Sequence, residues 1–240
     1  MEFNRIIGNG NVVRTLQNAA NVGPLNHAYL LHGTKGTGKR TLARTFAEAI
    51  LCRGENRPCG SCAACLKVEK GIHPDLMVVQ KPEGKANILV EQVRSLREQV
   101  YIRPNESEHR VVIIEESETM NLSAANALLK VLEEPPAYVV FILTANNISA
   151  LPETIASRCL CLEMQEVSLH QAEKWLLAHY PDGEAAMLEG ALSYGNGNLG
   201  RSIAYMEEKS CREKFDRALL VAKSLTTERE YDILEALSPF

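Results

Sequence analysis

The glycine-rich stretch "GTKGTGKRT" is the first candidate for chemistry in this chain. Gly33, Gly36, Gly38 and Lys39 fit the pattern G-x-x-x-x-G-K-[ST]. In that pattern, backbone N–H groups and a helix N-terminus close around phosphate and the lysine reaches the β- and γ-phosphates. The last position is Arg40 in place of Ser or Thr. We predict a loop of phosphate-binding ancestry, and binding of ATP or ADP stays open because a glycine-rich turn needs no ligand.

The remainder of a nucleotide site also departs from the usual pattern. Arg40 offers only hydrogen-bond donors and cannot be an oxygen ligand of Mg²⁺, while Thr41, about 100° further around the helix, is a poor substitute. An acidic pair after an apolar strand would complete the site, and "VVIIEESE" supplies Glu115 and Glu116. The first would hold the water shell of Mg²⁺ and the second would polarise the attacking water. The first position is normally Asp, and acidic residues at strand ends are also common by chance.

Four cysteines with the spacing C-x6-C-x2-C-x2-C form a second candidate site: Cys52, Cys59, Cys62 and Cys65. Four thiolates this close together predict a closed, tetrahedral structural Zn²⁺ site. The alternatives are an iron–sulfur cluster, for which the sequence shows no electron-transfer context, and four unligated thiols. We expect the other three cysteines in or near the core: Cys159, Cys161 and Cys211.

Five apolar runs predict the strands that position these residues: 27–33, 75–80, 110–116, 138–145 and 159–164. Several are continuous and β-branched, as in parallel strands buried on both faces. Between them, apolar residues recur with helical spacing in two stripes: Leu89, Val93, Leu96 and Val100, then Ala125, Leu128, Leu129 and Leu132. Pro135 disfavours helical geometry at Glu134 and ends the second helix. The alternation predicts an α/β fold with an open parallel sheet.

The chain turns helical after about residue 166. Ser168 is a plausible N-cap for "SLHQAEKWLLAHY", and further helical patterns follow, separated by a turn at "GNGNLG" (195–200) and ending with "EREYDILEALSPF". We therefore predict an α/β domain over residues 1–165 with the cysteine segment at 52–65. A helical domain over 166–225 and the start of a further region at 226–240 complete the prediction.

Composition narrows the function classes. The net charge of −4 argues against a chain whose whole surface grips nucleic acid. No apolar run approaches the roughly 20 residues of a membrane helix, and the N-terminus lacks the regions of a signal peptide, so we expect a cytoplasmic protein.

Zinc ligands directly after a phosphate-loop helix, together with "LNHAYLLHG", "HPDL", "NALLKVLEEPP" and "LPETIASRC", resemble the bacterial DNA polymerase III clamp-loader subunits. These AAA+ proteins place the ring-shaped sliding clamp on primed DNA. The resemblance covers residues ~5 to 205 and implies a five-stranded sheet of order 5-1-4-3-2, a helical lid and then a helical collar. Most of the collar is expected to be missing, and the isolated fragment to be monomeric.

Two types of subunit in this family carry these motifs: the gamma/tau ATPase motor and the delta prime stator, whose own ATP site is usually degenerate. Arg40 stands where the motor has Thr or Ser. The acidic motif of the motor resembles D-E-x-H, whereas here it begins with Glu115 in place of Asp and reads E-E-S-E. Gly200 stands where the motor lid carries a sensor Arg, and the N-terminus "MEFNRIIGN" lacks the motor's Arg and Pro. All four features resemble delta prime.

The resemblance also implies roles for two polar residues. By this resemblance Arg158, in S-R-C, would be the arginine finger that reaches the γ-phosphate of a neighbouring subunit, and Asn146 matches the sensor-1 position. The implied function is a stator without autonomous catalysis, assembled with gamma/tau and delta subunits, the clamp and primer-template DNA. A gamma/tau-type motor is the alternative. A zinc module that binds DNA by itself is weakened by net acidity and by the lack of aromatics among basic residues near the cysteines.

Overall fold

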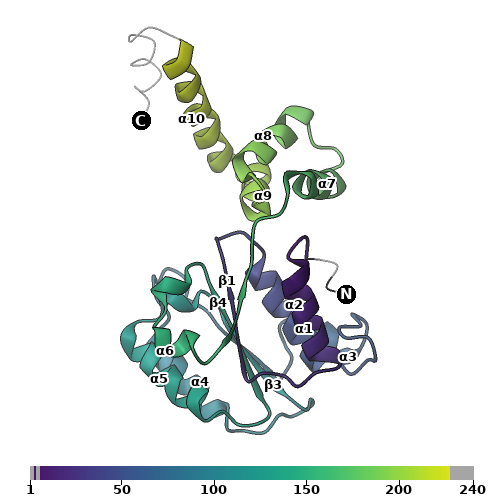
Figure 1. Cartoon of the computed structure of the whole chain (residues 1–240), viewed down its shortest axis with the longest axis vertical. Coiled ribbons are helices and arrows are strands. Elements are labelled where there is room, and N and C mark those ends of the chain that lie inside the picture. Colours follow the sequence, from purple (N-terminus) through teal and green to yellow (C-terminus); the bar gives the residue numbers. More distant parts are fainter. Residues whose placement is uncertain (1–2, 4–5, 228–240) are drawn as a thin grey trace. The chain divides into compact units, whose positions relative to one another are not determined.

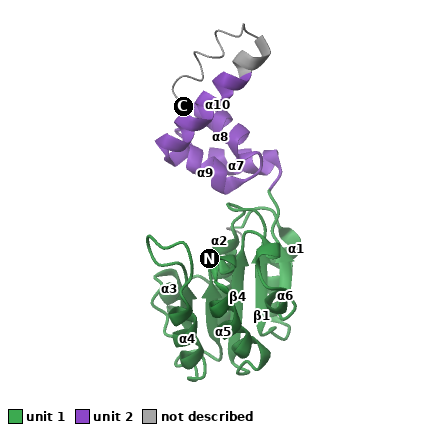
Figure 2. Ribbon diagram, turned by 90° about the vertical axis from the view of Figure 1, so that its left-hand side faces the viewer, with its two compact units in different colours: residues 1–166 green, residues 167–240 purple. Residues whose placement is uncertain are grey.

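The computed structural model describes residue 3 and residues 6–227, with side chains up to residue 222. The chain divides into two compact units, Met1–Glu166 and Val167–Phe240 (Figure 2). The last predicted helical pattern, "EREYDILEALSPF", lies outside the described residues, as does almost all of the predicted region 226–240. No helix in the described ranges is long and apolar enough to cross a membrane.

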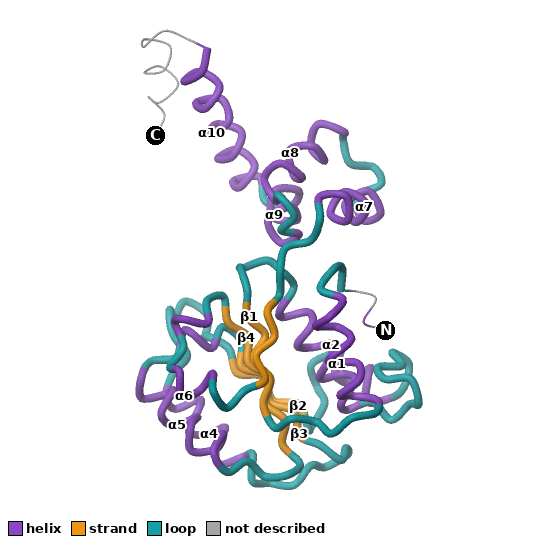
Figure 3. The backbone as a smooth tube through the Cα atoms, in the orientation of Figure 1, coloured by secondary structure: helices purple, strands orange, loops and turns teal. Residues whose placement is uncertain are grey.

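The first unit is built on a parallel sheet of five strands (Figure 3). The strands are β1 (Ala28–His32), β2 (Leu76–Val79), β3 (Arg110–Ile114), β4 (Val139–Ala145) and β5 (Leu160–Glu163). Their order is β2-β3-β4-β1-β5, and every neighbouring pair is parallel. The predicted fold class and the predicted strand order 5-1-4-3-2 are both confirmed.

Helices cover both faces of the sheet (Figure 1). One layer holds α1 (Gly10–Asn21), α2 (Lys39–Leu51) and α3 (Ala63–Glu69), and the other holds α4 (Val90–Gln99), α5 (Leu122–Glu133) and α6 (Glu153–Ala156). Alternate side chains of each central strand face opposite layers. Tyr29 and Leu31 pack with α1 and α2, whereas Ala28 and Leu30 pack with α4 and α5. The central strands are therefore apolar throughout.

The predicted helical stripes are largely confirmed. Val93, Leu96 and Val100 are buried, but the prediction was wrong for Leu89, which is 39% exposed because it precedes α4 as the N-cap residue. Three of the four apolar positions in the second stripe are buried, with Leu129 half-buried. That helix ends at Glu133, before the proline pair, as predicted.

The second unit contains α7 (Leu169–His179), α8 (Ala185–Gly195), α9 (Leu199–Glu207) and α10 (Lys209–Thr227). Ser168 caps α7 as predicted, because its hydroxyl accepts a hydrogen bond from the backbone N–H of Gln171 at 3.3 Å. Asn196 (φ 46°) and Gly197 (φ 88°) form the predicted turn between α8 and α9. The helices pack closely, since a Cβ on Gly195 would lie 1.9 Å from the Ser202 Oγ.

Candidate functional site

The glycine-rich loop connects the carboxyl end of β1 to α2, as its sequence predicts. Gly33 has φ 145°, and a Cβ there would lie 2.1 Å from the backbone oxygen of Met164, so only glycine fits. Gly36 and Gly38 also have positive φ, and Gly38 is the N-cap of α2 without a side-chain cap. Strand, loop and helix N-terminus thus have the arrangement that a phosphate-binding loop needs.

Lys39 is turned onto its own loop. Its Nζ donates to the carbonyl oxygens of Gly33 and Thr34, both at 2.7 Å, and the residue is 7% exposed. Burial lowers the pKa of Lys39, and the negative charges of Glu118 and Glu116 oppose this shift. The ammonium group therefore stabilises the closed shape of the loop.

Arg40 forms an ion pair with Glu115, the residue that follows β3. The Arg40 Nε lies 2.9 Å from the Glu115 Oε1, and the Arg44 Nη2 lies 3.6 Å from the same oxygen. The Arg40 Nη2 also donates to the Gln80 Oε1 at 3.4 Å. The Glu115 side chain is 8% exposed, so its charge is balanced mainly by these two guanidinium groups. Arg40 therefore pairs with the acidic residue that was predicted to hold the water shell of Mg²⁺.

The second acidic residue, Glu116, is also engaged. Its Oε2 lies 2.5 Å from the Lys81 Nζ, and its backbone, at φ 49°, donates to the Thr144 Oγ1 at 3.0 Å. The backbone N–H of Asn146 donates to the Glu118 Oε1 at 3.0 Å. Both glutamates and Asn146 therefore follow the carboxyl ends of β3 and β4, at the same end of the sheet as the loop. Thr144, whose hydroxyl accepts the Glu116 N–H, was not predicted from the sequence.

Thr41 is exposed on the first turn of α2, and its hydroxyl makes no hydrogen bond within the described part of the chain. Gly200 lies in the second unit, as the second residue of α9.

Arg158 lies near the amino ends of the strands, at the opposite end from the glycine-rich loop. It precedes Leu160, which pairs with Tyr29 near the amino end of β1, whereas the loop begins at Gly33 after the carboxyl end. Tyr29 and Gly33 are four steps apart along the chain, which at about 3.3 Å per residue is about 13 Å along the strand. The Arg158 side chain is 35% exposed; its Nη2 pairs with the Glu133 Oε1 at 2.9 Å and its Nη1 donates to the Thr154 carbonyl at 2.9 Å.

The four cysteines of the predicted zinc site come together, with all four Sγ atoms within 4.8 Å of one another. The Sγ–Sγ distances are 3.9 Å for Cys52–Cys62, 3.9 Å for Cys59–Cys65 and 3.5 Å for Cys62–Cys65. A tetrahedral ion with Zn–S bonds of about 2.3 Å needs sulfurs about 3.8 Å apart. The residues present therefore fit Zn²⁺.

Backbone N–H groups point at these sulfurs, as expected where thiolates must be stabilised. Gly54 and Cys59 donate to the Cys52 Sγ at 3.3 and 3.4 Å, and Cys62 donates to the Cys59 Sγ at 3.4 Å. Hydrogen bonds from the backbone of Ser61 and Cys62 lower the pKa of Cys59 to about 5, whereas burial raises the pKa of Cys65. The donor set can hold a divalent metal with no open coordination position.

The other cysteines differ in part from expectation. Cys159 is half-buried against the core and Cys211 is half-buried, but the prediction was wrong for Cys161, which is exposed. The reason is that β5 is an edge strand.

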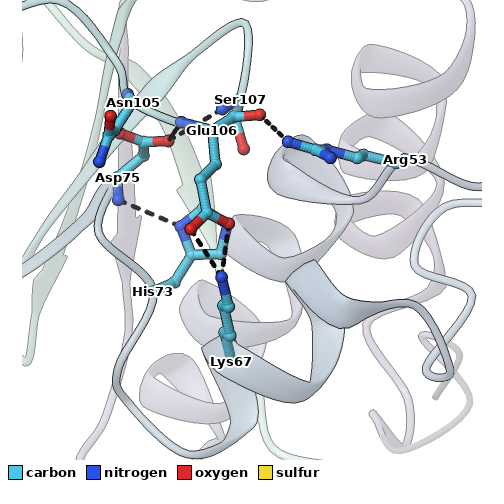
Figure 4. A network of polar contacts seen from close by, with 7 residues as sticks. All are labelled: Arg53, Lys67, His73, Asp75, Asn105, Glu106 and Ser107. Carbon is cyan, nitrogen blue, oxygen red and sulfur yellow. Dashed lines mark hydrogen bonds and ion pairs between the residues drawn. The ribbon is translucent and has the colours of Figure 1, made fainter.

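A polar network joins the cysteine segment to the sheet (Figure 4). Lys67 on α3 contacts both carboxylate oxygens of Glu106 at 2.6 and 2.7 Å, and Arg53 donates to the Glu106 carbonyl. Asp75, which is fully buried, accepts the backbone N–H groups of three consecutive loop residues at 2.6–2.9 Å: Asn105, Glu106 and Ser107. The His73 Nδ1 accepts the Asp75 N–H at 3.1 Å. The "HPDL" motif thus anchors the loop that holds the metal-binding segment.

Comparison with known proteins identifies relatives of this chain. The family model described as "DNA polymerase III, delta subunit" matches residues 8–168. The chain is 40% identical over 177 residues to the DNA polymerase III subunit delta' of Pseudomonas aeruginosa, covering 72% of this chain and 53% of that protein. It is 32% identical over 221 residues to subunit gamma of Buchnera aphidicola, covering 82% of this chain and 60% of that protein.

Two solved structures share the fold. A DNA polymerase III gamma subunit-related protein of Thermotoga maritima matches with a TM-score of 0.53 and 20% identity, over 94% of this chain and 76% of that one. The RuvB Holliday junction branch migration motor of the same organism matches with a TM-score of 0.55 and 18% identity, over 99% and 71%. The chain spans about 60% or less of the curated relatives named above.

Proposed function

The chain belongs to the DNA polymerase III clamp-loader family of AAA+ proteins, and from this premise we propose that it is a stator-type, delta prime-like subunit. Such a subunit helps to place the sliding clamp on primed DNA during replication. Its partners would be gamma/tau and delta subunits, with the clamp and primer-template DNA in the assembly. It would act on a neighbour's nucleotide through Arg158 and hydrolyse none of its own.

The position of Arg158 carries this proposal. The side chain lies at the opposite end of the strands from the chain's own loop, so it is suited to a nucleotide on another subunit. Its partner Glu133 is about half exposed, and an exposed ion pair contributes about 0–1 kcal/mol. The guanidinium group can therefore exchange Glu133 for a phosphate at little cost. An arginine finger beside the transferred phosphoryl group contributes about 10³–10⁵ in rate.

The state of the chain's own loop supports the second half of the proposal. Hydrolysis needs a lysine on the phosphates, an oxygen ligand for Mg²⁺ and a free acidic pair. Here Lys39 is bound to loop carbonyls, Arg40 replaces the oxygen ligand, and Glu115 and Glu116 are paired with basic side chains. Asn146, at the sensor-1 position, would then be a vestige of an active site.

A structural Zn²⁺ ion held by Cys52, Cys59, Cys62 and Cys65 is part of the same proposal. The ion would crosslink residues 52–65 and so fix α3, from which Lys67 reaches the Glu106 loop. A closed set of four thiolates leaves no position for a substrate, so the ion would supply stability and no catalysis.

One observation favours the alternative, a gamma/tau-type ATPase motor. The gamma subunit of Buchnera aphidicola aligns with more of this chain than the delta' subunit of Pseudomonas aeruginosa does, 82% against 72%. Identity is lower, however, and the Arg40–Glu115 pair opposes turnover.

Release of phosphate from ATP by the isolated chain, with and without Mg²⁺, separates the two functions. The stator proposal expects no release above the level of a Lys39→Ala variant. Mg²⁺-dependent turnover that Lys39→Ala abolishes would establish the motor instead.

A further inference from the structure

The carboxylate of Glu115, directly after β3, forms an ion pair with the side chain of Arg40. In P-loop proteins, Mg²⁺ is held through the hydroxyl after the loop lysine and an acidic residue on a neighbouring strand. The corresponding residues here are Arg40 and Glu115, and they are bound to each other at 2.9 Å. Magnesium demands six oxygen ligands in near-ideal geometry, and a guanidinium group has no lone pair to offer. The donor set therefore does not fit Mg²⁺.

Neighbouring contacts extend the mismatch beyond one residue. Arg44 adds a second guanidinium group 3.6 Å from the same Glu115 oxygen, and Gln80 accepts a hydrogen bond from Arg40 on its other side. Glu116 is paired with Lys81. Both carboxylates that follow β3 are thus neutralised by basic side chains, and a divalent cation would meet positive charge on its approach.

We propose that Arg40 replaces the divalent cation at this loop. Its guanidinium group, paired with Glu115, excludes Mg²⁺, so that the loop rejects the Mg²⁺ complex of a nucleotide. The inference concerns the chain's own loop and does not depend on Arg158 acting on a neighbour.

The substitution Arg40→Thr tests the proposal because it restores the hydroxyl and removes the guanidinium group nearest to Glu115. The matched control Arg40→Lys keeps the positive charge without the hydroxyl. Arg44 stays beside Glu115 in both variants, so the buried carboxylate keeps a basic neighbour. Fluorescence anisotropy would follow a fluorescent ADP analogue bound to each full chain, once with Mg²⁺ in excess and once with EDTA.

The expected result is that Mg²⁺ raises the affinity for the ADP analogue in Arg40→Thr only. Mg²⁺ should give the wild-type chain and Arg40→Lys no gain in affinity. Arg40→Thr should gain about tenfold or more with Mg²⁺, the effect of one added charge-assisted contact. A wild-type chain that binds no ADP in either buffer fits exclusion of the complex, and the gain in Arg40→Thr then decides the matter.

Three outcomes would overturn the proposal. They are a tenfold Mg²⁺ gain in the wild-type chain, the same gain in Arg40→Lys, or none in a folded Arg40→Thr chain. Far-UV circular dichroism establishes folding, and Arg40→Ser provides a second hydroxyl variant if Arg40→Thr does not fold. ATPase measurements on the assembled loader with Arg158 variants fail or succeed independently, so failure of this inference is distinct from failure of the stator proposal.

Discussion

Replacing Asp75 by asparagine should destabilise the first unit more than its small chemical change suggests. The side chain is fully buried, and its Oδ2 accepts the N–H groups of Glu106 and Ser107 at 2.7 and 2.9 Å, while its Oδ1 accepts that of Asn105 at 2.6 Å. Asparagine keeps the shape but turns one oxygen into an NH₂ group. Whichever way the amide points, it faces at least one N–H donor with another donor.

The magnitude follows from the groups left without partners. A hydrogen bond to a charged group contributes about 1.5–3 kcal/mol, and the variant loses one or two such bonds and weakens the others. Buried Arg110, 3.8 Å from the Asp75 Oδ1, also loses its nearby negative charge, although it still donates to the carbonyl oxygens of Gln99 and Arg103. We expect Asp75→Asn to lower the free energy of unfolding by about 3–5 kcal/mol.

Urea denaturation can assign this loss to the first unit. The chain's single tryptophan, Trp175, lies in α7 of the second unit, so its fluorescence reports on that unit, whereas far-UV circular dichroism reports on both. Asp75→Asn should lower the dichroism midpoint and leave the fluorescence transition unchanged. The control Asp182→Asn makes the same chemical change at an exposed position and should stay within about 0.5 kcal/mol. A loss below about 1 kcal/mol in Asp75→Asn would refute the reasoning.

Lowering the pH should reduce the difference in the free energy of unfolding between the wild-type chain and Asp75→Asn. Burial alone would raise the pKa of Asp75, but the three backbone donors outweigh it and the pKa is lowered. A carboxylate with a lower pKa in the folded state stabilises above its unfolded pKa of about 3.9, and this contribution is lost as pH falls towards the folded pKa. The stability gap should therefore shrink below about pH 4, and a gap that stays constant would contradict the assignment.

Two further substitutions test the metal site and the packing of the second unit. Cys59→Ser should reduce bound zinc from about one ion per chain to near zero by mass spectrometry, whereas Cys161→Ser, at an exposed cysteine outside the cluster, should retain it; equal zinc content would exclude the four-cysteine site. Gly195→Ala should lower the stability reported by Trp175 fluorescence by about 1–3 kcal/mol, because its Cβ would lie 1.9 Å from a side-chain oxygen on α9. An unchanged stability in Gly195→Ala would contradict this close packing of α8 against α9.

Local patterns predicted much of this fold. The apolar runs and the proline after Glu134 located all five strands and the end of α5, because strands buried on both faces and helix ends leave their signature within a few residues. The cysteine spacing likewise predicted a cluster that the structure brings together. Leu89 and Cys161 were misplaced because their exposure depends on a helix start and on the sheet edge, which the hydrophobic pattern does not show.

Long-range pairing could not be predicted in the same way. Arg40 and Glu115 are 75 positions apart, and only the order β3-β4-β1 brings the ends of their elements together. The role of Asp75 was hidden for the same reason, since its partners lie about 30 residues away. A short motif can draw attention to a charged residue, but the residue it pairs with depends on the order of the strands and is not visible in the motif.

ATP hydrolysis by the loader assembled with this subunit tests the central claim most directly. Arg158→Ala and Lys39→Ala are compared, with Glu133→Gln as the control that removes the partner of Arg158 and leaves the guanidinium group in place. We predict that Arg158→Ala lowers the rate by about tenfold or more, while Lys39→Ala and Glu133→Gln stay close to wild type. A loss in Lys39→Ala equal to or greater than that in Arg158→Ala would contradict the account.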